Sequence, residues 1–368
     1  MRTYAHINYM ADYTYIETPE GLKNACEIWK EEETLAIDIE CENNLHHYGT
    51  FITLIQLSTT KGHWIIDVLS LKNINPLKGL MENPKIQKLF HDVSFDLRIL
   101  NFQFGCRPKN VFDTQIAATF LNKKDIGLKN LLDEYFHVTK EKKYQMADWT
   151  KRPLSPDMLL YALHDTAHLI HLRNILRKDL RAAGKYEWFC EEMDHIESLE
   201  MEHKENTYQD MKGYVFLTDT QRSILKVIFE LREKYAQKVN MPNYFVMNNK
   251  KILELVAHPP RTLGGWERLQ GTHPIIRSRA KSFFSAVEKA KQQKISLPPN
   301  NHKRFTPEQR QALAKLHRVR EHVAGKVDLQ KHLVMSKEQM QQIIVSNSLD
   351  GLRSWQQKLL KKYDSDIA

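Results

Sequence analysis

The sequence has no long apolar segment and no leader-like N-terminus. No apolar run approaches the roughly 20 residues that a helix needs to cross a bilayer, which argues against a membrane-spanning protein. The chain begins MRTYAHINYMADYTYIE, which is polar and aromatic and has neither the apolar stretch nor the small-residue cleavage site of a secretory signal. We therefore expect a cytoplasmic protein.

Cysteine is also scarce. The four cysteines are far apart and none is in a CxxC pair. This spacing indicates neither a disulfide framework nor a zinc site, and it suits a reducing compartment. They are Cys26, Cys41, Cys106 and Cys190.

Length and charge divide the chain into parts. With 368 residues, of which 42% are hydrophobic, it is long enough for two or three domains with sizeable cores. Residues 1–200 carry 24 Lys and Arg against 29 Asp and Glu, whereas residues 201–368 carry 30 against 16. A basic C-terminal half would attract a phosphate backbone, although a merely solvated basic surface would have the same composition.

The first part of the chain has the pattern of an α/β domain, and the rest is helical. Short strand-like runs at 35–39, 51–57, 63–69 and 85–91 alternate with helical patterns at 94–104, 113–122, 127–136 and 156–183. After residue 186 no strand pattern returns. We predict an α/β domain over 1–185, a connecting helix over 186–210, a helical domain over 211–292, a linker over 293–305 and a second helical domain over 306–368.

Four carboxylates and a tyrosine are the most informative residues. Asp38 and Glu40 alternate at the end of an apolar strand, so both side chains face the same way. Asp96 lies near the start of a helix, and Tyr161 and Asp165 have the i, i+4 spacing that places them on one helix face. Such acids are costly to bury unless cations lie between them.

These ligands predict a pair of hard divalent ions. Carboxylate oxygens favour Mg²⁺ or Mn²⁺ over Zn²⁺. Two such ions about 4 Å apart are the arrangement that hydrolyses phosphodiesters in line. A nuclease is therefore the leading interpretation, in which Tyr161 would orient the attacking water or help to deprotonate it.

The order of the motifs resembles a known superfamily. The segments LAIDIE, KLFHDVSFDLRIL and LLYALHDTAHL are similar to the three motifs of the DEDD 3′→5′ exonucleases, in the subgroup with tyrosine in the last motif. Within that subgroup the resemblance is to the ribonuclease D family. The segments LREKYAQKVNMPNYFVMNN and LGGWERLQG resemble the HRDC nucleic-acid-binding module, and the final segment would be a second, divergent copy.

The resemblance implies a fold, an activity and a site. The fold would be a ribonuclease H-like exonuclease domain, with a mixed sheet flanked by helices, followed by two small all-α HRDC-like domains. Asp38, Glu40, Asp96 and Asp165 would bind two metal ions, and Tyr161 would position the attacking water. The activity would be 3′→5′ trimming of RNA, including precursor tRNA, with release of 5′-nucleoside monophosphates. The partner would be RNA with a free 3′ end, and a monomer is the simplest expectation.

Some residues and functions compete with this interpretation. Asp92 is an extra acid one turn before Asp96, and we expect it to be an outer or surface acid. His164, His168 and His171 form a helical stripe, for which a partly exposed helix face is a simpler explanation than a metal site. Relatives that use histidine in the last motif carry it where this chain has Leu160. A DNA exonuclease and a non-catalytic RNA-binding scaffold remain alternative functions.

Overall fold

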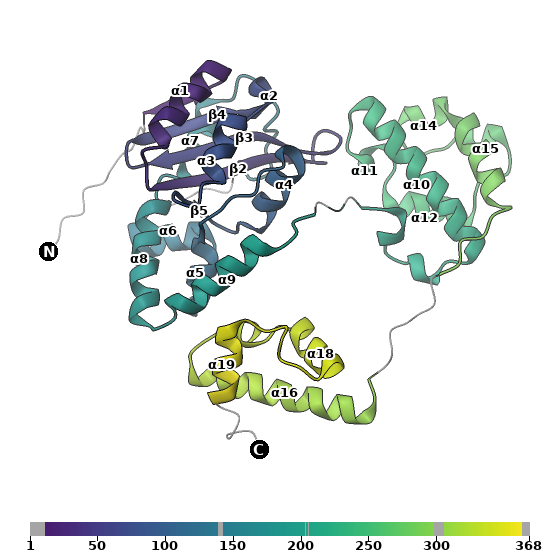
Figure 1. Ribbon diagram of the computed structural model, residues 1–368. Coiled ribbons are helices and arrows are strands. Elements are labelled where there is room, and N and C mark those ends of the chain that lie inside the picture. The colour runs from purple at the N-terminus through teal and green to yellow at the C-terminus, as the bar shows by residue number, and fades with distance from the viewer. Residues whose placement is uncertain (1–11, 139–142, 203, 205, 298–304, 363–368) are drawn as a thin grey trace. The chain divides into compact units, whose positions relative to one another are not determined.

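The computed structural model describes residues 12–138, 143–202, 204, 206–297 and 305–362. Contacts divide the chain into two compact units. Figure 1 shows the helices and strands in their order along the chain. The first unit contains residues 1–40, 52–202 and 304–368, and the second contains residues 41–51 and 203–303. Residues 298–304, the main part of the predicted linker, lie outside the described residues, as does the N-terminal segment 1–11.

The first unit is built on a mixed six-stranded sheet with the order β1-β4-β3-β2-β5-β6. β3 and β4 are antiparallel, whereas β1 with β4, β2 with β5, and β5 with β6 are parallel. The predicted fold class is confirmed. The strands are β1 (Tyr13–Ile16), β2 (Thr34–Asn43), β3 (Thr50–Thr59), β4 (Gly62–Asp67), β5 (Gln87–Phe90) and β6 (Val111–Asp113).

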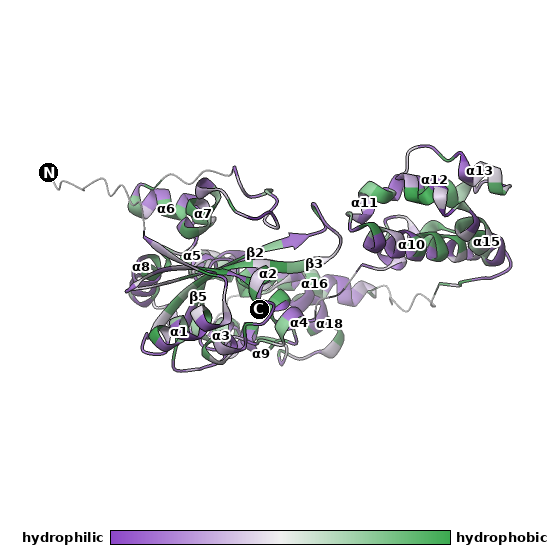
Figure 2. Cartoon of the chain, turned by 90° about the horizontal axis from the view of Figure 1, so that it is seen from above, coloured by the Kyte–Doolittle hydropathy of each residue, from purple (hydrophilic) through white to green (hydrophobic). Residues whose placement is uncertain are grey.

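Helices cover the sheet. Figure 2 shows α7 on one side of it and α1, α3 and α4 on the other. The helices of the exonuclease-like part are α1 (Pro19–Trp29), α2 (Val68–Leu71), α3 (Asn75–Met81), α4 (Ser94–Phe104), α5 (Thr114–Phe120), α6 (Leu128–Phe136), α7 (Pro156–His164), α8 (Leu169–Ala182) and α9 (Tyr186–Ser198).

The strand that carries the first two acids is central and apolar. In β2 the residues before Asp38 are buried, because this strand lies between β3 and β5 and both of its faces are covered. Toward its end the burial alternates: Ile39 is buried, whereas Asp38 and Glu40 are half-buried. The pleat therefore directs the two carboxylates to one face and the isoleucine to the other.

The prediction of one long helix over 156–183 is wrong. The chain forms α7 and α8 with a break between His164 and Leu169. At the break the buried Thr166 hydroxyl hydrogen-bonds the Ser58 hydroxyl of β3 at 2.6 Å, and the backbone N–H of Thr166 reaches back to Leu163 at i−3. The break therefore coincides with a contact between the chain and the sheet. The sequence pattern did not reveal β1, α1, α3 and β6; of these, β1 and β6 are strands of only four and three residues.

The last helical segment packs onto the exonuclease-like part within the first unit. It consists of α16 (Pro307–Lys326), α17 (Lys331–Val334), α18 (Lys337–Ser346) and α19 (Ser354–Lys362). Trp355 of α19 is buried, stacks on Trp188 of α9 with ring centroids 5.2 Å apart, and meets Phe120 of α5 edge-on. Arg353 forms a bidentate ion pair with Glu192 of α9, at 3.0 and 3.1 Å. One apolar core therefore joins this segment to the exonuclease-like helices.

The second unit is a helical domain joined by the tip of the β2–β3 hairpin. Its helices are η1 (Tyr208–Asp210), η2 (Tyr214–Phe216), α10 (Asp219–Val239), α11 (Asn243–Val246), α12 (Asn249–Ala257), α13 (Leu263–Glu267), α14 (Pro274–Ser278) and α15 (Ala280–Ala290). Trp266 and Phe283 stack in its core. The Tyr48 hydroxyl of the hairpin tip donates to Glu233 of α10 at 3.2 Å.

No helix in the described ranges is both long enough and apolar enough to span a membrane.

Candidate active site

Three of the predicted ligands come together in the first unit. Carboxylate oxygens of Asp38 and Glu40, from β2, and of Asp165, at the end of α7, all lie within 4.8 Å of one another. Asp38 and Glu40 are half-buried and Asp165 is buried. Three carboxylates at this spacing repel one another unless a cation lies between them, and oxygen ligands in such a cluster suit Mg²⁺ or Mn²⁺.

Asp96 stands outside that group of three but interacts with it electrostatically. It lies in the first turn of α4 and is 8% exposed. Burial raises its pKa well above the usual range, and the charges of Asp38, Asp113, Asp92 and Glu40 raise it further. The carboxyl of Asp96 therefore faces the same concentration of negative charge as the other acids.

Asp113 fixes the start of α4. Its buried carboxylate accepts hydrogen bonds from the backbone N–H of Asp92 and Val93, just before α4, and from those of Gln115 and Ile116 in α5. Burial raises the pKa of Asp113, and these four N–H groups counteract the rise. Asp113 therefore caps the start of α5 and also fixes the backbone that leads into α4. Asp92 itself is exposed.

Tyr161 lies on α7, one turn before Asp165. Its ring lies near that of Tyr144, at 5.7 Å and edge-on, and near that of Trp149, at 6.1 Å. Burial, with the charges of Glu40 and Asp38, raises the pKa of Tyr161 to about 12. The phenol is therefore protonated near neutral pH. It can donate or accept a hydrogen bond to water, whereas a phenolate base is not populated.

The other polar groups at the ends of α7 were not found by sequence reasoning. Arg152, before the helix, pairs with Asp67 of β4, and Thr166, after it, bonds Ser58. No motif marks such pairs, because their members are 85 and 108 residues apart in the chain.

Within the described ranges, His164, His168 and His171 form no group of three ligand atoms close enough to share an ion.

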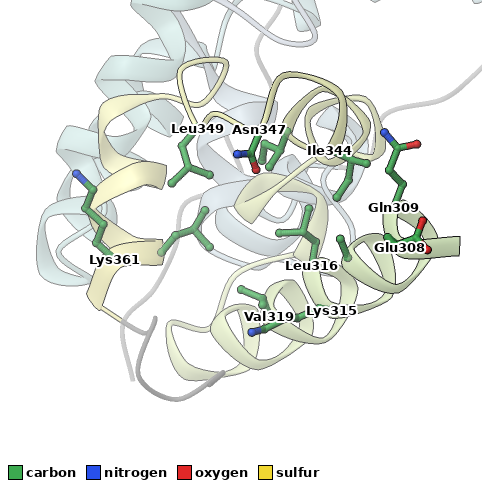
Figure 3. A pocket seen from close by; sticks show the side chains of 12 residues that line it. Glu308, Gln309, Lys315, Leu316, Val319, Ile344, Asn347, Leu349 and Lys361 are labelled. Carbon is green, nitrogen blue, oxygen red and sulfur yellow. The ribbon is translucent and has the colours of Figure 1, made fainter. Parts of the chain in front are cut away.

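A separate hollow opens in the last helical segment. It has a volume of about 480 Å³ and lies between α16, α18 and α19. Figure 3 shows Leu316 and Leu349 on its apolar wall and Lys315 and Lys361 among the residues around it. None of the acidic motif residues lines this hollow, so it is not the site of phosphodiester chemistry.

Comparison with known proteins agrees with this arrangement. Residues 13–181 match the 3′-5′ exonuclease family, and residues 221–285 match the HRDC domain. Ribonuclease D of Escherichia coli is 27% identical over 285 residues, which cover 76% of this chain and 75% of that protein. Ribonuclease D of Nitrobacter hamburgensis is 26% identical over 362 residues, which cover 94% and 92%.

Eukaryotic relatives are longer. The exosome complex exonuclease RRP6 of Saccharomyces cerevisiae is 26% identical over 295 residues, which cover 75% of this chain but only 40% of that protein.

Among solved structures, Escherichia coli RNase D has a TM-score of 0.72 at 24% identity and covers 97% of this chain and 98% of its own. The catalytic core of RRP6 from Trypanosoma brucei has a TM-score of 0.68 at 25% identity, with coverage of 76% and 80%.

The fold and the acidic cluster define a 3′-5′ exonuclease domain, followed by an HRDC domain. The chain is similar to ribonuclease D proteins over most of its length, and its exonuclease domain makes it an exoribonuclease.

Proposed function

We propose that this exoribonuclease shortens precursor tRNA and other stable RNAs from their 3′ ends by two-metal hydrolysis. The observation that carries the proposal is the convergence of Asp38, Glu40 and Asp165 within 4.8 Å, together with the electrostatic effect of Asp38 and Glu40 on the buried Asp96. This cluster fits divalent cations, because cations relieve the repulsion among carboxylates and carboxylate oxygens are their preferred ligands. Asp38, Glu40, Asp96 and Asp165 would hold the two ions, Mg²⁺ or Mn²⁺.

The chemistry divides between the ions and the chain. When bound, two such ions activate a water and stabilise the oxygen that leaves. The protonated Tyr161 phenol positions the attacking water by a hydrogen bond, and its ring is in contact with those of Tyr144 and Trp149. The water oxygen bonds to phosphorus as the bond from phosphorus to the 3′ oxygen breaks. The RNA keeps a 3′ hydroxyl, and the product is a 5′-nucleoside monophosphate.

RNA binding is assigned to the basic C-terminal half. Residues 201–368 carry 30 Lys and Arg against 16 Asp and Glu, which supports backbone affinity without sequence choice. In the second unit the Phe216 side chain is 89% exposed and Phe245 is 56% exposed. Exposed aromatic rings beside basic residues are typical platforms on which unpaired bases stack.

The cellular context of the proposal is a monomer in the cytoplasm. None of the four cysteines forms a disulfide, and two of them are buried, which suits a reducing compartment.

The test is digestion of a 3′-extended tRNA that carries a label at its 5′ end. Wild type with Mn²⁺ should produce a ladder that shortens from the 3′ end, whereas EDTA or the variant Asp38→Ala with Asp165→Ala should leave the RNA intact. The exposed acid Asp133 of α6 provides the control, Asp133→Ala, which should digest normally. Products that shorten from the 5′ end, or full activity in EDTA, would overturn the proposal, and digestion of matched DNA alone would redirect it to DNA repair.

A further inference from the structure

The loop that leads into α7 is fastened to the sheet by Arg152. Its Nε donates to Asp67 Oδ2 at 2.6 Å, and its Nη2 donates to Asp67 Oδ1 at 2.7 Å. Asp67 is the last residue of β4 and is 1% exposed. Two parallel hydrogen bonds between a guanidinium and a carboxylate fix the orientation of the guanidinium, whereas a single hydrogen bond would let it rotate.

Asp67 is held firmly on its own side. It also accepts from the Tyr15 hydroxyl of β1 at 2.8 Å and from the Ser70 hydroxyl at 3.1 Å. Although burial alone would raise its pKa, the bonds from Arg152 and Tyr15 lower the pKa of Asp67 to about 2. The carboxylate is therefore ionised at any working pH and forms a fixed anchor for Arg152.

Arg152 is connected to Tyr161 through Trp149. Arg152 Nη1 donates to the carbonyl oxygen of Trp149 at 2.8 Å, and Nη2 also donates to the carbonyl oxygen of Thr53 at 3.2 Å. The Trp149 side chain is 3% exposed, and its ring lies against that of Tyr161. The guanidinium thus fixes the backbone of the residue whose ring supports the phenol.

The other end of α7 has a separate anchor. Thr166 bonds Ser58 of β3 at 2.6 Å, and Ser58 in turn bonds Nδ1 of His63 at 2.7 Å. Asp165 is the immediate neighbour of Thr166. Loss of the Arg152 anchor should therefore displace Tyr161 while Asp165 keeps its place.

We propose that Arg152 is a positioning residue, which acts through Trp149 to hold the Tyr161 phenol where the attacking water is oriented. The inference rests on the proposed role of Tyr161. The simple alternative is an ion pair that only stabilises the fold. A buried ion pair is weak evidence for stability, because desolvation offsets its attraction. Its directional geometry, in contrast, is well suited to fixing a neighbour.

The test is a double-mutant cycle between Arg152→Lys and Tyr161→Phe. Lysine keeps the charge but cannot make the two-bond pair. Because small misplacements of a catalytic group are costly, Arg152→Lys should lower kcat about tenfold with little change in KM. In the Tyr161→Phe background the same change should cost less than about twofold, since residues that act through one another are not additive.

Two controls separate positioning from folding. Mn²⁺ binding, followed by electron paramagnetic resonance, should stay within about twofold of wild type, because the ligand acids keep their places. Arg353 makes a matched two-bond pair with Glu192 in the last helical segment. Arg353→Lys should leave kcat unchanged. If Arg152→Lys does not fold, Trp149→Phe replaces it in the cycle and should show the same coupling.

The outcomes are distinct. An equal loss of kcat in the wild-type and Tyr161→Phe backgrounds, or a wild-type kcat in Arg152→Lys, would overturn the inference. Wild-type activity of Tyr161→Phe by itself would instead overturn the role proposed for Tyr161.

Discussion

Replacing Asp165 by asparagine should stabilise the metal-free protein while abolishing its activity. In the absence of cations, Asp165 is buried beside two further carboxylates, Asp38 and Glu40. Neutralising it removes repulsion from the folded state that the unfolded chain does not have. Asparagine has nearly the same shape, so packing at the end of α7 should be kept.

The magnitude follows from the spacing. Two carboxylates 4.8 Å apart, the upper limit within this group, repel by about 3 kcal/mol at an effective dielectric constant of about 20. Water around the half-buried Asp38 and Glu40 screens part of this, which leaves an expected gain of about 1–3 kcal/mol. A gain of 2 kcal/mol corresponds to a rise in melting temperature of about 4–8 °C.

The assay is thermal unfolding of wild type and Asp165→Asn, each in EDTA and in Mn²⁺. In EDTA the variant should melt at the higher temperature. Mn²⁺ at about 100 times its Kd should stabilise wild type by about 2.7 kcal/mol per site, and the variant by less. Asp133→Asn, at an exposed acid on α6, should change neither curve. A variant that is less stable than wild type in EDTA and has an undiminished response to Mn²⁺ would refute the reasoning.

Three further results are expected. Because the pKa of Asp96 is raised, the folded metal-free protein keeps a proton that the unfolded chain releases at lower pH. Stability to urea in EDTA should therefore fall as pH rises from the ordinary pKa of an aspartate to the raised pKa of Asp96. Asp96→Asn should remove this pH dependence, and a dependence that persists in the variant would contradict its assignment to Asp96. Trp355→Ala should lower the free energy of unfolding in urea by about 3–5 kcal/mol, because a buried ring in contact with Phe120 and Trp188 is lost. An unchanged urea midpoint would show that the last helical segment is not part of the first unit's core. Phe216→Ala should weaken RNA binding by about 5–100-fold in fluorescence anisotropy if a base stacks on it. Val345→Ala, at another exposed apolar residue, should not weaken it, and equal effects of the two changes would exclude stacking at Phe216.

Local pattern was sufficient for much of the fold and for the choice of candidate residues. The period-2 alternation around Asp38 and Glu40 predicted their common face, and α4 runs from Ser94 to Phe104 and ends at Gly105, as predicted. Alternation and helix-ending glycine are properties of a few neighbouring residues. They can therefore be recognised before any tertiary contact is known.

Contacts between distant segments decided the rest. The break between α7 and α8 occurs where Thr166 contacts Ser58, and the helical periodicity of 156–183 contains no sign of it. The same holds for the docking of Trp355 onto α9, which the sequence pattern describes only as an amphipathic helix.

The sequence by itself thus determined which carboxylates could form a metal site, because residue type and local spacing set the chemistry. Only the tertiary structure decided that Asp38, Glu40 and Asp165 meet within 4.8 Å, and that burial beside Glu40 and Asp38 raises the pKa of Tyr161 above its ordinary value. Those properties depend on through-space distance and on burial. They are set by segments far apart in the chain, namely β2, α7 and the loop held by Arg152.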